Sequence, residues 1–119
     1  MPQTEDEFAK ILIEAVDHGL RILGESSRKA ILYHLEKDYS ITRTKIPEHT
    51  EAFTKGLESI FGAGSLVIER SILKYLYSKL GLKYEEKRNC RFIDSLNKAK
   101  ELWQENPRKV DEEAELISA

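Results

Sequence analysis

The chain has 119 residues, of which 40% are hydrophobic and 34% are charged, and its formal net charge is −2. This length fits one domain with a self-supporting core, and the charge excludes a general electrostatic attraction to nucleic acid. The lone cysteine, Cys90, excludes an internal disulfide, and no apolar run approaches the roughly eighteen residues of a membrane span. We therefore expect a soluble, cytoplasmic protein with no membrane segment.

Helical spacing of apolar residues predicts two helices in the first third of the chain. The first helix begins at Thr4, which forms a capping box with the glutamate three residues later. It ends at Gly24. The second helix is capped by Ser26 or Ser27 and ends near Asp38. Four apolar residues form the predicted inner face of this second helix: Ala30, Ile31, Leu32 and Leu35.

The segment from Ser40 to Ile46 leaves two structures open. It is either a single turn capped by Thr42 or a loop that its two isoleucines hold against the core. Pro47 suits the first position of a new helix, which we expect to run to Phe61. Gly56 lies inside this helix, where glycine costs about 1 kcal/mol relative to alanine, so it predicts a close contact between helices.

A glycine hinge, Gly62-Ala63-Gly64, separates that helix from the most apolar helix in the chain. Ser65 is the predicted N-cap, and Gly81 is expected to adopt the left-handed conformation that ends the helix after Leu80. At about 100° per residue, apolar side chains cover roughly half of its circumference. They are Leu66, Ile68, Ile72, Leu73, Tyr75, Leu76 and Leu80.

The last predicted helix spans Arg88 to Gln104, with Phe92 and Trp103 on its apolar stripe. Pro107 stops it, and residues 105–119 are expected to be a mobile, acidic tail. No stretch alternates apolar and polar residues as a strand does. We therefore predict an all-α fold, a single-domain bundle of about five helices over residues 4–104 around the central helix at 65–80.

One carboxylate is out of place on the central helix. Glu69 falls within the apolar arc, between Leu76 and Leu80 on the helical wheel. Burying it unpaired is unfavourable and raises its pKa. Glu69 therefore either lies at an open helix start, where it is wet or bonds to the Gly62–Gly64 hinge, or it binds a ligand or a proton. A structural ion pair is the third alternative, for which the candidates are Arg28, Lys29, His34 and the tyrosines.

Part of the apolar arc, with Tyr75 and Tyr77, is a candidate contact with a second copy of the chain, because symmetric homodimers are the commonest soluble assemblies. Burial against neighbouring helices of the same chain is the alternative. The candidate binding residues are Glu69, His34, Tyr75 and Tyr77.

The histidines predict no metal site. His18, His34 and His49 lack the spacing that gathers ligands, such as two histidines one helical turn apart. The hinge lacks the residues of a phosphate-binding loop, and no nucleophile motif is present. We therefore expect no enzymatic activity and no cofactor.

Basic residues gather from the central helix onward and predict a basic surface for an acidic partner. They are Arg70, Lys74, Lys79, Lys83, Lys87 and Arg88. Residues 26–61 can also be drawn as a helix-turn-helix for DNA. However, its second helix begins with Glu48 and Glu51 close to where DNA phosphates would lie, which makes nucleic acid the weaker prediction.

A set of short segments suggests a family. In chain order they are Gly24-Glu25-Ser26, Ala30 to Leu35, Ile46-Pro47, Ile60-Phe61-Gly62-Ala63-Gly64, Glu69, Lys74 with Leu76, and Leu82-Lys83-Tyr84. Over about residues 8–103 the chain resembles small helical domains of archaeal proteins that are described as signalling output domains of uncharacterised activity. The resemblance implies a non-enzymatic regulatory module.

These observations together predict a small cytoplasmic signalling module that acts through protein contacts, as a homodimer. A helix-turn-helix DNA-binding regulator and a small-ligand sensor that uses a buried Glu69 are the alternatives.

Overall fold

The computed structural model describes residues 2–85 and 91–105, which are helical and contain no strand. In chain order the elements are α1 (Pro2–Arg21), α2 (Glu25–Tyr39), the 3-10 helix η1 (Arg43–Glu48), α3 (Thr50–Phe61), the 3-10 helix η2 (Gly62–Gly64), α4 (Ser65–Leu80) and α5 (Phe92–Glu105). The predicted all-α bundle of five helices is confirmed.

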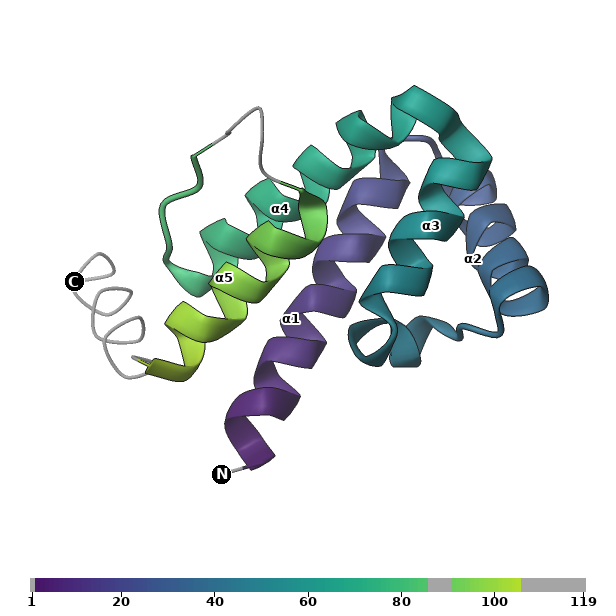
Figure 1. The fold of residues 1–119 in the computed structure, drawn as a ribbon. Helices are drawn as coiled ribbons and strands as arrows, with labels where there is room; N and C mark the ends of the chain where they lie inside the picture. The colour runs from purple at the N-terminus through teal and green to yellow at the C-terminus, as the bar shows by residue number, and fades with distance from the viewer. Residues whose placement is uncertain (1, 86–90, 106–119) are drawn as a thin grey trace.

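The bundle is arranged around two helices. α1 runs through the middle, with α2 and α3 on one side and α4 and α5 on the other (Figure 1). The contact between α1 and α4 is the most extensive, and α4 also contacts α3 and α5. The helix predicted at residues 65–80 has those bounds and is central, but it shares that position with α1.

The core lies where α1 packs on α4. Buried side chains include Leu12, Val16 and Leu20 from α1 and Ile68, Ile72, Leu76 and Leu80 from α4. Burial of each such side chain stabilises the fold by about 1.5–3 kcal/mol. A glycine permits the close approach: a Cβ added to Gly19 would lie 2.6 Å from Ile72 Cγ1.

Gly56 plays the same role on the other side of α1, as the sequence predicted. A Cβ added there would lie 2.5 Å from Leu35 Cδ2, so α3 and α2 approach closely at this position. The predicted inner face of α2 is only partly right. Ile31 and Leu35 are buried, but Ala30 is exposed, because α2 lies at the edge of the bundle and packs mainly on α1 and α3.

The buried arc of α4 is rotated relative to the prediction. Leu66 is 55% exposed, whereas Tyr77 is buried. α5 packs beside the later turns of α4, where Tyr77 Oη donates a 2.7 Å hydrogen bond to the Ser95 carbonyl oxygen. The first turn of α4, which carries Leu66, lacks such cover on that side.

The predicted side-chain caps are wrong. α1 begins at Pro2 and not at Thr4, since proline needs no N–H partner at a helix start. Ser26 and Ser27 lie inside α2, and Gly24 precedes its first residue. Ser65 forms no side-chain cap, because η2 runs directly into α4 and carbonyl groups of η2 accept the backbone N–H. Two helix ends are as predicted: α3 ends at Phe61, and Gly81, in the left-handed conformation with φ 72°, ends α4.

The remaining helix boundaries follow from the connectors. Pro47 lies inside η1, so α3 begins at Thr50, and the buried Ile41 and Ile46 fix the segment before it. α5 begins at Phe92 and not at Arg88, and Asp94 Oδ2 accepts a 3.4 Å hydrogen bond from the Arg91 backbone N–H at this start. Residues 86–90 and the predicted tail beyond Glu105 lie outside the described residues.

Candidate functional site

The predicted glycine hinge is a corner at which α3 turns into α4 through η2 (Figure 1). We refer to residues 58–69 as the corner. Gly62 has φ 57° and ψ −132°, a backbone conformation that residues other than glycine rarely adopt. Its backbone is exposed, and a Cβ added there would have nothing within 4 Å. The corner is therefore held by its two helix arms and not by contacts of the hinge itself.

Glu69 points into the bundle from the first turns of α4. The α1-facing side of α4 is marked by Ile72 and the α5-facing side by Tyr77. At 100° per residue, Glu69 lies about 60° from Ile72 and about 80° from Tyr77, between these two sides. Accordingly the residue is only 6% exposed, so the hypothesis of a wet carboxylate is wrong.

No hydrogen bond or ion pair joins the Glu69 carboxylate to another described residue. Its Oε2 atom is buried without a hydrogen bond, and no described residue forms an ion pair with it. Arg28 pairs with Asp17 and Glu25 instead, and His34 pairs with Asp38. The hypothesis of a structural ion pair is therefore not supported for these residues.

The electrostatic environment of Glu69 favours its neutral form. Burial raises the pKa of this carboxyl above its ordinary value, and the negative charge of Glu58 raises it further. Glu58 lies one turn before the hinge on α3, and Glu69 lies one turn after it on α4. Each arm of the corner therefore carries one carboxyl group, and the buried one, Glu69, is the group that favours binding a proton.

Tyr75 faces away from the corner and stacks against α1. Its ring centroid is 4.5 Å from that of His18, with 24° between the ring planes. Lys79 Nζ lies 5.5 Å from the Tyr75 ring centroid, within the range of a cation–π interaction. Tyr75 is half-buried by these contacts within one chain, so it offers less free surface than the dimer hypothesis assumed.

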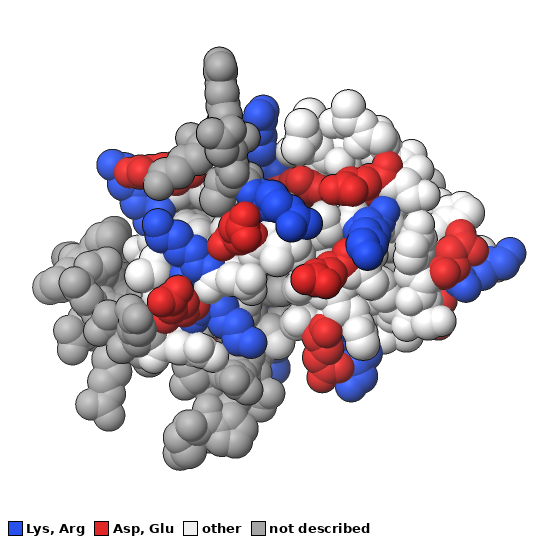
Figure 2. All heavy atoms as spheres, in the orientation of Figure 1, with Lys and Arg blue, Asp and Glu red and all other residues white. Residues whose placement is uncertain are grey.

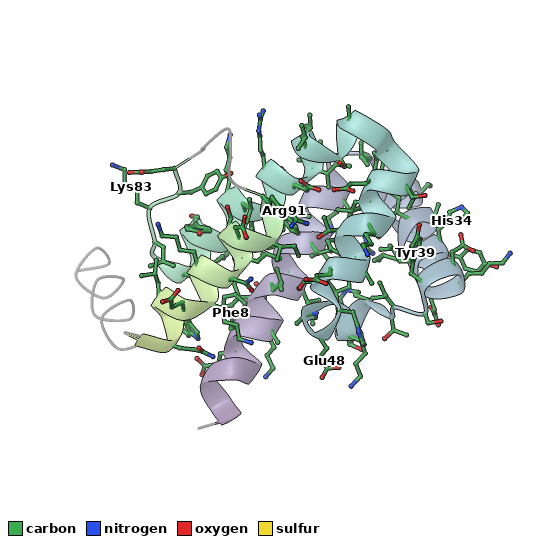
Figure 3. The ribbon with its side chains drawn as sticks, viewed as in Figure 1. Phe8, His34, Tyr39, Glu48, Lys83 and Arg91 are labelled. Carbon is green, nitrogen blue, oxygen red and sulfur yellow. The ribbon has the colours of Figure 1, made fainter. Side chains whose placement is uncertain are left out.

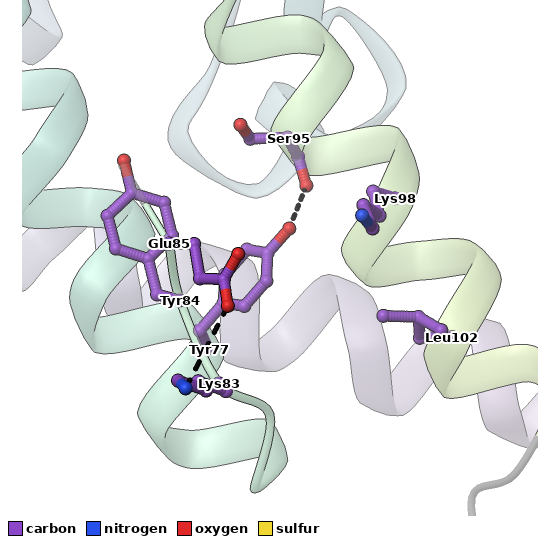
Figure 4. A pocket seen from close by; sticks show the side chains of 7 residues that line it. All are labelled: Tyr77, Lys83, Tyr84, Glu85, Ser95, Lys98 and Leu102. Carbon is purple, nitrogen blue, oxygen red and sulfur yellow. Dashed lines mark hydrogen bonds and ion pairs between the residues drawn. The ribbon is translucent and has the colours of Figure 1, made fainter. Parts of the chain in front are cut away.

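Tyr77 lies at a cavity of about 220 Å³ between the end of α4, the connector after it and α5 (Figure 4). Its ring packs 5.2 Å from that of Tyr84, and its hydroxyl bonds to the Ser95 carbonyl oxygen. Lys83 Nζ lies 3.8 Å from Glu85 Oε1 at the rim. The cavity joins two predicted site residues, Tyr77 and Lys83, but these contacts occupy their polar groups.

The remaining predicted residues are dispersed. His34 on α2 and Lys83 lie at opposite ends of the molecule (Figure 3). Arg70 and Lys74 share one side of α4, whereas Lys79 projects about 140° away from Lys74. Lys87 and Arg88 lie outside the described residues.

Blue and red side chains alternate on the visible face of the molecule (Figure 2). On this face, therefore, the described residues form no single basic surface.

The helix-turn-helix geometry is also a poor fit. Ten residues, 40–49, connect α2 to α3, whereas the DNA-binding motif has a turn of about three or four residues. A hollow of about 530 Å³ at the start of α3 is lined by Glu48 and Glu51, among others. Carboxylates at this position would repel phosphates.

The sequence did not reveal a second buried carboxylate, Asp17. This carboxylate is 6% exposed and accepts hydrogen bonds from Arg28 Nη1 at 3.0 Å and from Arg43 Nε at 2.9 and 3.0 Å. Burial alone would raise its pKa, but the hydrogen bond and charge of Arg43, together with Arg28, lower it overall. The cluster joins α1, α2 and η1, and its members lie too far apart in sequence to give a local signal.

The described residues contain no group of three or more His, Cys, Asp or Glu side chains that could hold a metal ion. Among these residues no helix is both long and apolar enough to cross a bilayer. The fold defines an all-α helical bundle whose unusual feature is the buried carboxylate at the corner. Comparisons with protein-family models, curated proteins and solved structures found no match to this chain.

Proposed function

We propose that the protein is a small regulatory interaction module that associates with a second copy of itself through the corner. It acts through protein contacts and not through catalysis. The observation that carries the proposal is the apolar surface at the corner. The resemblance to archaeal signalling output domains supports a regulatory role, and with it a cytoplasmic location.

The corner presents large aliphatic side chains to solvent. Val67 is 64% exposed, Leu66 is 55% exposed and Ile60 is 38% exposed. In a chain with 34% charged residues, the nine residues from Ile60 to Ile68 carry no charge. Figure 2 shows the corresponding uncharged surface where α3 turns into α4. Exposed apolar surface of this kind marks interaction sites on soluble proteins.

A second copy of the chain suits this surface. In a two-fold symmetric dimer each patch meets the same patch on the partner, so a charge near the axis would meet its own like charge. The uncharged run avoids that repulsion. The end of α1 reaches the same end of the bundle, because Gly19 contacts Ile68 and Ile72. The turn that follows α1 adds the exposed Ile22 and Leu23.

The test is the oligomeric state of the protein and of a variant in which Val67 becomes aspartate. Val67 is exposed, so the substitution should leave the fold intact, while two facing aspartates would repel each other. We expect the wild type to sediment as a dimer and Val67→Asp as a monomer in analytical ultracentrifugation. The matched control is Tyr33→Asp, at a residue that is 60% exposed on α2.

The control variant should remain a dimer. A wild-type protein that is monomeric up to about 1 mM would overturn self-association, because such weak binding is worth no more than about 4 kcal/mol. A dimer that Val67→Asp leaves unchanged would show that the corner is not the interface.

A further inference from the structure

Glu69 is placed where an ionised carboxylate is unfavourable. Its side chain is buried, its Oε2 atom has no hydrogen-bond donor, and no described cation pairs with it. A carboxyl group in such a site either keeps its proton or gains contact with water. Each state of Glu69 therefore favours a different arrangement of the corner.

On the neighbouring elements that the structure describes, no charged group pairs with Glu69. On α3, Glu58 adds a like charge. On α1, Asp17 is held by Arg28 and Arg43, and His18 stacks on Tyr75.

The other two neighbours offer no partner either. The 3-10 helix η2 has no titratable side chain. At the start of α5, Arg91 and Asp94 are exposed, and neither pairs with Glu69. On α4 itself, Arg70 and Lys74 are exposed on the outer side.

The corner has a place at which it can bend. Gly62 and Gly64 flank a single residue, and Gly62 has no atom within 4 Å of the position where a Cβ would lie. Movement there would separate the first turns of α4 from α3 and admit water to Glu69. The interface between α1 and the later turns of α4, around the fully buried Leu76 and Leu80, need not change.

We propose that Glu69 is a proton-dependent switch for the corner. With a proton on Glu69, the first turns of α4 pack against α3 as in this structure; without it, they separate at the glycine hinge. Separation would move Leu66 and Val67 away from Ile60 and divide the apolar surface. If the corner mediates self-association as proposed above, dimerisation then strengthens as the pH falls.

The switch is tested by hydrogen exchange of the backbone amides of residues 66–72, corrected for the intrinsic pH dependence of exchange. In the wild type, protection should fall about threefold or more between about pH 5 and about pH 8 as the proton is lost. Glu69→Gln, which is neutral at both pH values, should change less than about twofold. Glu51→Gln, at an exposed glutamate on α3, is the matched control and should behave as the wild type.

A direct titration of the wild type keeps the test decisive if Glu69→Gln folds poorly. The side-chain carboxyl carbon of Glu69, followed by NMR, should titrate above the ordinary range of glutamate. A midpoint within or below that range overturns the switch, as does equal pH dependence of exchange in the wild type and in Glu69→Gln.

The oligomeric state separates this proposal from the previous one. Ultracentrifugation at both pH values is compared with the exchange data. pH-dependent exchange in a protein that is monomeric throughout supports the switch and overturns self-association. A dimer whose exchange and association constant do not respond to pH supports self-association and overturns the switch.

Discussion

Asp17 and Glu69 are equally buried carboxylates with opposite surroundings. Both are 6% exposed. Asp17 is held by Arg43 and Arg28, which lower its pKa despite its burial, whereas Glu69 has no partner among the described residues, and burial raises its pKa. Burial therefore does not decide whether a carboxylate stabilises this fold; the neighbouring charges decide it.

The two sites divide the molecule into a fixed region and an adjustable one. The Asp17 cluster connects α1, α2 and η1 through side chains from three elements. The Glu69 site lies at the corner, where α3 and α4 are joined by a glycine-rich turn without side-chain caps. Ionisation strengthens the first region and weakens the second, so we place regulation at the second.

The largest effect is expected from Asp17→Asn. This change removes the negative charge that Arg28 and Arg43 share and replaces one acceptor oxygen by an NH2 donor, so it should lower the free energy of unfolding by about 2–4 kcal/mol in urea titrations at neutral pH. The control is Glu25→Gln, which removes the other carboxylate that contacts Arg28. Because Glu25 is 53% exposed, its loss should matter far less. Equal effects of the two substitutions would show that burial of the pair is unimportant.

The contribution of Asp17 to the free energy of unfolding should also depend on pH. This change with pH should be smaller than the loss caused by Asp17→Asn at neutral pH. The pKa of Asp17 is lowered in the folded state, so its stabilisation is complete above the unfolded pKa of about 4 and is lost as the pH falls through the folded pKa. The difference in unfolding free energy between the wild type and Asp17→Asn should therefore be constant near neutral pH and shrink in acid. A difference that grows in acid would contradict this assignment.

Much of the fold could be predicted because its signals are local. The apolar spacing and the flanking glycines of the central helix gave its bounds at residues 65–80, and Gly56 inside a helix indicated a close helix contact. The caps could not be predicted in this way. Whether Ser65 caps α4 depends on how η2 leads into the helix, and that geometry is set by tertiary packing.

The candidate site was accessible to sequence analysis only in part. The helical wheel located Glu69 within an apolar arc, but its burial depends on α1, α3 and α5, which one helix cannot reveal. Asp17 gave no signal, since its partners lie 11 and 26 residues away. The predicted basic surface stays a prediction, because Lys79 projects from another side of α4 than Arg70 and Lys74, and Lys87 and Arg88 lie outside the described residues.

Replacing Glu69 by methionine should have the opposite sign to Asp17→Asn. An apolar side chain of similar size completes the buried arc, so Glu69→Met should raise the free energy of unfolding by about 1–2 kcal/mol at neutral pH. The raised pKa of Glu69 also makes the stability depend on pH. The folded wild type binds the Glu69 proton more tightly than the unfolded chain does, so the free energy of unfolding falls as the pH rises through the folded-state pKa of Glu69. The difference in unfolding free energy between Glu69→Met and the wild type should therefore grow with pH. A variant less stable than the wild type at neutral pH would contradict this prediction.

The smallest effect is expected from Glu58→Gln, which changes the surroundings of Glu69 and leaves Glu69 itself intact. Because the negative charge of Glu58 raises the pKa of Glu69, its removal should lower the NMR titration midpoint of Glu69 and stabilise the fold by about 0.3 kcal/mol at neutral pH. Glu51→Gln, on the first turn of the same helix, removes an equal charge far from Glu69 and should leave the midpoint unchanged. Equal shifts in both variants would mean that Glu69 responds to the net charge of the protein and not to its neighbour across the corner.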